Sequence, residues 1–115
     1  MRKSLTRKQV VKKRLEIDAI FRNGKKYSAK QVKLLVADNN LEINRIIVIP
    51  VKNYGNSVER NRIKRQIKEI WRVENPNFKS GLDFAFVVYP GKALDYWTQK
   101  GNLTTLFEKA NLYKI

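Results

Sequence analysis

The 115-residue sequence contains neither cysteine nor histidine. The lack of cysteine excludes a disulfide framework and thiolate metal sites, which fits a reducing cytoplasm. The lack of both residues also excludes cysteine nucleophiles, histidine acid-base catalysis and the common zinc sites. No apolar run approaches the roughly 18 residues that a membrane span requires, and no signal-peptide core follows the basic N-terminus. We therefore expect a cytoplasmic chain without a membrane partner.

Acidic residues are few and scattered. The ten carboxylates occur singly along the chain and form no cluster typical of a two-metal nuclease. We therefore predict no catalytic residue and no metal ligand within the chain. Against ten Asp and Glu stand 25 Lys and Arg, which give a net charge of +15 and a pI of about 10.3. Such a balance is typical of nucleic-acid-binding proteins.

The length and the apolar content indicate one folded domain over residues 1–115. Hydrophobic residues make up 43% of the sequence, too many for a disordered basic tail. One modest core can form within this length, but two cannot. The positive charge is therefore expected on a folded scaffold, with residues 1–12 as a mobile basic arm.

Residues 55–72 predict a helix with two contrasting faces. The apolar stripe falls at helical spacing and is expected to be buried: Ile63, Ile67, Ile70 and Trp71. The opposite face and its flanks carry a basic set: Arg60, Asn61, Arg62, Lys64, Arg65, Lys68 and Arg72. A face of this charge repels itself unless a polyanion neutralises it, so a phosphate backbone is the expected partner.

A solvated surface is the alternative, since helix cations usually pair with carboxylates one turn away. Glu59 can reach Arg62, and Glu69 can reach Arg65 or Arg72. Lys64 and Lys68 have no acidic neighbour in the helix at the right spacing. The scarcity of such pairs favours nucleic acid.

The remaining elements are expected to form a two-layer α+β sandwich. A first helix at 13–22 is expected to bury Ile17, Ile20 and Phe21 and to end at Gly24 in a left-handed cap. Strands are predicted at 32–38, 45–51 and 82–89, and a last helix at 96–110. Asn56 or Ser57 is the expected N-cap of the basic helix, and the Pro at 76 ends its region.

Further basic and aromatic residues extend the candidate RNA contacts beyond the basic helix. They are Lys12, Lys13, Arg14, Lys52 and Tyr54. The basic N-terminal segment fits either a nucleic-acid contact that orders on binding or a solubilising tail. Tyr27 and Tyr54 lie in basic loops, where base stacking and simple exposure are both open.

Residues 55–65 (GNSVERNRIKR) resemble the signature of the bacterial ribonuclease P protein component. Its hallmark is an Arg-Asn-Arg core, here Arg60-Asn61-Arg62, followed by Lys64-Arg65. The resemblance extends to residues 16–24 (EIDAIFRNG) and 103–114 (LTTLFEKANLYK), which are similar to the first and last helices of the family.

This resemblance implies the protein subunit of a ribonucleoprotein that removes the 5′ leader from precursor tRNA. In such a complex the RNA subunit and its bound Mg²⁺ carry out the hydrolysis. The partners implied are ribonuclease P RNA and precursor tRNA, and the basic helix is implied to bind the RNA subunit.

The family also implies an αβββαβα order, with a left-handed crossover and a short extra strand near 26–29. A cleft for the single-stranded leader is implied at five positions: Ile17, Phe21, Val32, Lys33 and Leu35. Relatives often carry aromatic residues where this chain has Ile17, Val32 and Leu35. Contacts in the cleft are therefore expected to be more apolar or phosphate-based than stacked.

Two other functions fit the composition. A non-catalytic RNA-binding protein, such as a ribosome-associated factor, would share the charge and the fold. A DNA recognition helix is the other, but the chain lacks the short helix-turn-helix pairing that places such a helix in a major groove. We therefore expect no DNA partner.

Overall fold

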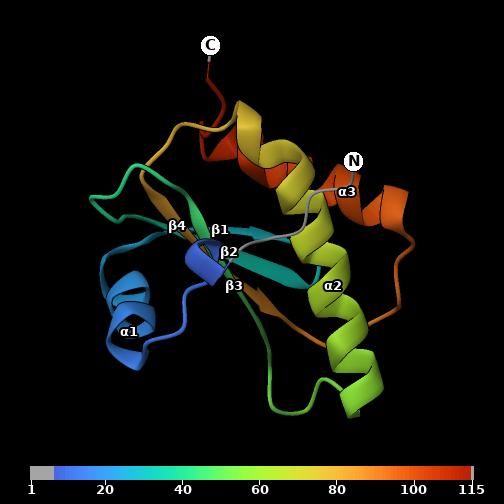
Figure 1. The fold of residues 1–115 in the computed structure, drawn as a ribbon. Coiled ribbons are helices and arrows are strands. Elements are labelled where there is room, and N and C mark those ends of the chain that lie inside the picture. Colours follow the sequence, from blue (N-terminus) through green and yellow to red (C-terminus); the bar gives the residue numbers. More distant parts are fainter. Residues whose placement is uncertain (1–6, 115) are drawn as a thin grey trace.

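A four-stranded mixed sheet separates α1 from α2 and α3 in the computed structural model, which describes residues 7–114 (Figure 1). The helices are η1 (Arg7–Gln9), α1 (Arg14–Asn23), α2 (Ser57–Glu74), η2 (Asn75–Asn77) and α3 (Tyr96–Lys109). The strands are β1 (Lys25–Ala29), β2 (Val32–Asp38), β3 (Arg45–Pro50) and β4 (Leu82–Val88). These bounds confirm the three predicted strands and three predicted helices to within two residues.

The strands lie in the order β1-β2-β4-β3. β1 pairs with β2, and β2 with β4, in antiparallel fashion, while β3 and β4 are parallel. A parallel pair requires a crossover connection, which here contains α2. β1 confirms the short extra strand that the family resemblance implied. The left-handed sense of the crossover stays a prediction.

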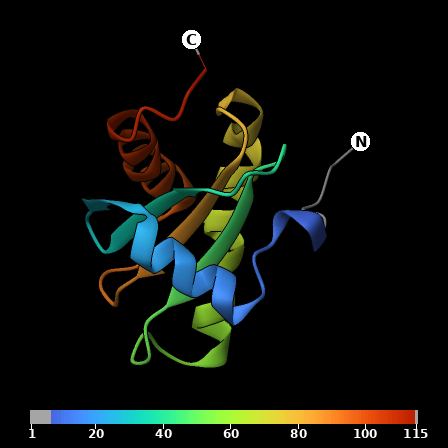
Figure 2. The same ribbon diagram turned by 90° about the vertical axis from the view of Figure 1, so that its left-hand side faces the viewer.

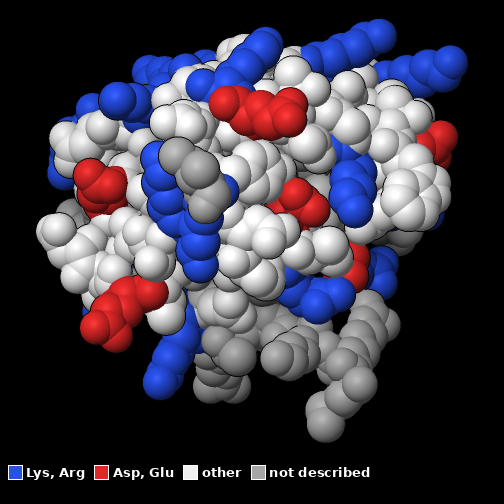
Figure 3. Space-filling view, turned by 90° about the horizontal axis from the view of Figure 1, so that it is seen from above, with Lys and Arg blue, Asp and Glu red and all other residues white. Residues whose placement is uncertain are grey.

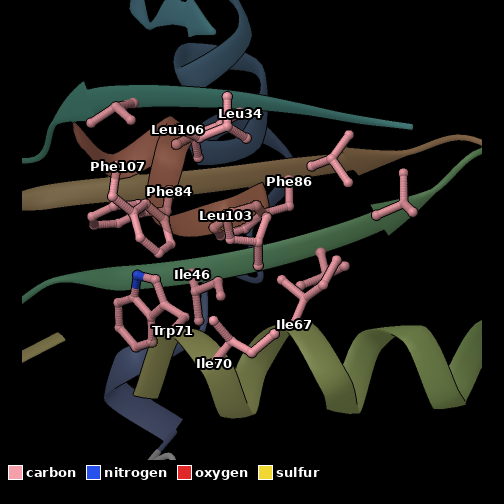
Figure 4. Packing of buried hydrophobic residues seen from close by; sticks show 14 of the residues in the cluster. Leu34, Ile46, Ile67, Ile70, Trp71, Phe84, Phe86, Leu103, Leu106 and Phe107 are labelled. Carbon is pink, nitrogen blue, oxygen red and sulfur yellow. The ribbon is translucent and has the colours of Figure 1, made fainter. Parts of the chain in front are cut away.

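The main core lies between the sheet and the helices α2 and α3 (Figure 4). All four residues of the predicted apolar stripe of α2 are buried there. Trp71 is fully buried and lies edge-on to Phe84, with 5.6 Å between the ring centroids. This packing fixes the orientation of α2, so its opposite face is turned to solvent.

A smaller core lies under α1 on the other face of the sheet. Figure 2 shows α1 lying across that face. Its buried members are Val11, Ile20, Leu35, Ala85 and Val87. Successive strand side chains point to opposite faces, so Leu34 and Leu35 enter different cores. The predicted two-layer sandwich is thus present as the sheet with α2 and α3, and α1 adds a partial third layer.

Two local expectations at the N-terminal side are wrong. Gly24 is extended, with φ −73° and ψ 147°, and not left-handed. Glycine is needed there because a Cβ would lie 2.5 Å from the carbonyl oxygen of Ile20. Phe21 is 38% exposed because it lies beyond the edge of the small core.

The predicted mobile arm is wrong in its second half. Val10 forms a parallel bridge with Ile46, and Val11 is buried and donates its backbone N–H to the Ile46 carbonyl at 3.0 Å. Apolar burial and strand-like pairing hold these residues against β3. Residues 1–6 of the arm lie outside the described part of the chain.

Candidate nucleic-acid interface

The solvent side of α2 brings four predicted contact residues together around a shallow depression. They are Asn61, Lys64, Arg65 and Lys68. Asn61 and Arg65 are exposed, whereas Lys64 and Lys68 are half-buried. We call these four residues the basic face. No salt bridge joins any of them to a carboxylate within residues 7–114.

The electrostatics of the basic face favour an anion. Burial lowers the pKa of the Lys68 ammonium, and the neighbouring charge of Lys64 lowers it further. Both effects act against the protonated form. A phosphate placed between the two ammonium groups would relieve the repulsion.

The start of α2 is fixed by a capping box. The Asn56 side chain accepts the backbone N–H of Glu59 at 2.9 Å, and Glu59 Oε1 accepts the backbone N–H of Asn56 at 3.1 Å. The prediction that named Asn56 or Ser57 as the cap is thereby resolved to Asn56. Among the described residues, Glu59 forms no salt bridge with Arg62, which is exposed beside the basic face.

The guanidinium of Arg60 is bonded to the protein backbone. It donates hydrogen bonds to the carbonyl oxygens of Val51 at 2.6 Å and Pro50 at 2.9 Å. These bonds tie α2 to the end of β3. The structure therefore gives Arg60 a positioning role that its place in the sequence did not reveal.

Arg72 is paired along its own helix. It donates to both carboxylate oxygens of Glu69, from Nε at 3.0 Å and from Nη2 at 2.6 Å. This pairing raises the pKa of Arg72. Its charge is compensated, so Arg72 stands apart from the basic face with which it was predicted.

The five predicted leader-cleft residues do not share one surface. Lys33 and Leu35 lie on the α1 face of β2, opposite Val87 and Ala85 of β4. Ile17 packs on the same small core. Val32 is 2% exposed and belongs to the core on the other side of the sheet. Its inclusion in the cleft is wrong, because neighbouring strand residues alternate between faces.

The accessible part of the α1 face is narrower than predicted. Leu35 is fully buried beneath α1, and Ile17 and Lys33 are half-buried. Phe21 is exposed at 38%. Ile17 and Lys33 therefore stay partly accessible, whereas Leu35 does not.

Comparisons with known proteins show the family of the chain. The Ribonuclease P family model matches residues 5–111. The chain belongs to the ribonuclease P protein family. The ribonuclease P protein component of Natranaerobius thermophilus is 36% identical over 103 residues, which cover 89% of this chain and 90% of the relative. That of Caldanaerobacter subterraneus is 34% identical over 116 residues and covers 99% and 97%.

The fold of this ribonuclease P protein is also found in solved structures. The RNase P protein of Staphylococcus aureus superimposes with a TM-score of 0.83 at 22% identity, and the match covers 92% of this chain and 98% of that one. As a ribonuclease P protein component, the chain is a subunit that assists the RNA of this endoribonuclease complex in tRNA processing.

An ion-pair cluster around Arg45 joins α1 to the sheet of the ribonuclease P protein. Arg45 donates to Asp83 at 2.8 Å from Nε and at 2.7 Å from Nη2, and to Glu16 of α1 at 3.2 Å. These bonds outweigh burial and raise the pKa of Arg45. Asn39 also donates to Asp83, at 2.9 Å. Sequence reasoning missed this cluster, which lines a depression along α1.

The other predicted RNA contacts are spread over the surface. Lys12, Lys13, Arg14 and Lys52 are exposed, although Arg14 lies 3.5 Å from Asp18. Tyr27 and Tyr54 are half-buried against the main core, so neither is simply exposed. Burial raises the pKa of the Tyr54 hydroxyl, and Glu59 adds to this shift.

Positive charge is not confined to α2. Seen from above, the molecule shows Lys and Arg side chains around its rim, with Asp and Glu between them (Figure 3). Within residues 7–114, no three acidic residues lie close enough to hold a metal ion. In the same part of the chain, no helix is both long and apolar enough to cross a membrane.

Proposed function

We propose that the chain binds the RNA subunit of ribonuclease P through the basic face of α2. The observation that carries this proposal is the set of cations at Lys64, Arg65 and Lys68, which gather around one depression without a carboxylate partner among residues 7–114. Phosphate oxygens supply the missing negative charge, and their binding releases condensed counterions.

Hydrolysis in this proposal is carried out by the RNA subunit with its bound Mg²⁺. The chain supplies neither a histidine nor a cysteine, and its role is to place cations between phosphates. Fixed protein cations reduce the repulsion that diffuse Mg²⁺ would otherwise have to screen. The protein therefore lowers the Mg²⁺ concentration at which the RNA is active, in the cytoplasm where tRNA is processed.

The precursor tRNA leader is proposed to bind on the α1 face. Lys33 offers a half-buried cation on this face, where Ile17 packs on the small core, and α1 also carries the exposed ring of Phe21. A cation next to apolar surface suits a single strand, whose phosphates and base faces are both accessible. This part of the function gives the protein a contact with substrate separate from its contact with the RNA subunit.

The test is leader cleavage from precursor tRNA by a bacterial ribonuclease P RNA at low Mg²⁺, with and without the protein. We expect stimulation by the wild type and its loss in a Lys64→Ala and Arg65→Ala double variant. A matched control, Lys30→Ala with Lys109→Ala, removes the same charge from exposed sites elsewhere and should keep the stimulation. Absence of stimulation by folded wild type with a compatible RNA would contradict the proposal that the protein lowers the Mg²⁺ requirement, and stimulation that the double variant keeps would contradict the role of the basic face.

A further inference from the structure

A second cleft lies on another flank of α2, between its first half and the loop that joins β4 to α3. Its walls include Ile63, Pro90 and Leu94, with the ring of Tyr54. Its volume is about 160 Å³. Cavities of about 150 Å³ admit a benzene-sized ring, so one planar ring fits here.

We propose that this cleft binds one unpaired nucleobase of the RNA whose phosphates contact the basic face. The proposal rests on the RNA binding proposed above. The link between the two sites is Arg62, which lines the cleft and directly follows Asn61 of the basic face. A strand whose phosphates lie along Asn61 and Arg65 has its bases within reach of the cleft. The planar guanidinium of Arg62 can stack on a base at the entrance.

The polar groups in the cleft suit a base edge better than a phosphate. The Gln66 Nε2 group donates a hydrogen bond to the Leu94 carbonyl at 3.2 Å. The Oε1 atom of the same amide can then accept a hydrogen bond from a base. Glu59 adds a carboxylate whose Oε1 is already held by the Asn56 backbone. A carboxylate repels phosphate but accepts hydrogen bonds from exocyclic amino groups. Among the single-ring bases, the cleft should therefore prefer cytosine, which has an exocyclic amino group, over uracil, which has none.

The direct test uses amide NMR spectra of the whole chain with single-stranded pentanucleotide RNAs. A cytidine pentamer is compared with an abasic pentamer of the same phosphate number and with a uridine pentamer. We expect both cytidine and abasic RNA to shift the signals of the basic face. The cytidine pentamer should also shift the signals of Gly91, Ala93, Leu94 and the Gln66 side-chain amide. The uridine pentamer should shift them less, and the abasic pentamer should leave them unchanged.

Affinity should follow the same pattern. Base stacking contributes enough to make the abasic pentamer bind about tenfold more weakly than the cytidine pentamer. Ala93→Phe places a ring in the cleft and should bring cytidine binding down to the abasic level, while abasic binding stays unchanged. Thr98→Phe adds the same ring at an exposed site outside the cleft and is the matched control.

The outcomes separate the two proposals. Equal affinity for cytidine and abasic pentamers, with no shift of the cleft signals, overturns the nucleobase site and leaves phosphate binding intact. If neither RNA shifts the basic face, the proposed RNA binding itself fails. If Ala93→Phe unfolds the protein, the variant also loses binding of the abasic pentamer. The wild-type spectra then still test whether the cleft binds a base.

Discussion

The guanidinium of Arg60 donates a 2.6 Å hydrogen bond to the backbone carbonyl of Val51, nine positions earlier in the chain. A second bond reaches the Pro50 carbonyl. The first arginine of the Arg-Asn-Arg segment therefore holds the basic helix against the end of β3. Positioning of the helix and neutralisation of phosphate are divided between neighbouring residues of one short motif.

Replacement of Arg60 should therefore lower the stability of the fold, because it removes the two hydrogen bonds to β3 and its end. Hydrogen bonds from a charged group contribute about 1.5–3 kcal/mol each when buried. Because Arg60 is only half-buried, we expect Arg60→Ala to lower the free energy of unfolding by about 1–2 kcal/mol. Arg62→Ala, at an exposed position, should change it by less than about 0.5 kcal/mol. Urea unfolding curves measure both, and equal midpoints for the two variants would refute the positioning role.

Glu69 restrains one cation that could otherwise contact RNA. Glu69→Gln removes the carboxylate that holds Arg72, so RNA affinity at low salt should rise by about two- to fivefold. Glu108→Gln, an exposed change on α3, alters net charge equally and should raise affinity less. Filter binding to ribonuclease P RNA measures both changes. Equal gains in the two variants would show that net charge alone sets the affinity.

Lys68 gives RNA binding a dependence on pH. Its pKa in the free protein lies below the ordinary 10.5, because burial and Lys64 disfavour the charged form. Phosphate favours the charged form, so the pKa rises in the complex and binding takes up a proton at alkaline pH. Affinity should then fall as pH rises through the pKa of the free protein.

The Lys68→Arg variant isolates this effect. Arginine stays protonated over the whole accessible range, so the alkaline loss of affinity should be smaller than in the wild type. Binding measured across the alkaline range at constant ionic strength tests the expectation. Identical pH profiles for the two proteins would rule out Lys68 as the titrating group.

Replacement of the neighbouring β2 residues Val32 and Lys33 should affect different properties of the protein. Lys33→Ala should weaken binding of precursor tRNA but leave binding of mature tRNA unchanged, because only the precursor carries a leader. Val32→Ala creates a cavity in the main core and should lower stability by about 1–3 kcal/mol. Its ratio of precursor to mature affinity should stay that of the wild type. A leader-specific loss in Val32→Ala would contradict the assignment of the two faces.

Regular periodicity made α2 predictable from sequence. The stripe from Ile63 to Trp71 repeats at helical spacing, and Asn56 precedes it in a position suited to capping. Both signals are local, so neighbouring residues suffice to recognise them. β1 lacked any such signal, because Lys25–Ala29 is a mostly exposed edge strand without an apolar alternation, and only the family resemblance indicated it.

Pairings between distant residues could not be predicted. Arg45 and Asp83 lie 38 positions apart, and their contact follows from the parallel register of β3 and β4. The same limit explains Arg60, whose partners are backbone carbonyls that carry no sequence signal. Val32 was misassigned because it was matched to a family position singly, although side chains of neighbouring strand residues point to opposite faces of the sheet.

The salt dependence of RNA binding tests the central claim, that the basic face neutralises phosphates. For about four single-strand phosphate contacts, log K should fall with log salt at a slope of roughly 3. The Lys64→Ala and Arg65→Ala double variant loses two contacts, so its slope should drop to roughly 1.4. A wild-type slope near zero, or a slope that the double variant leaves unchanged, would contradict the account.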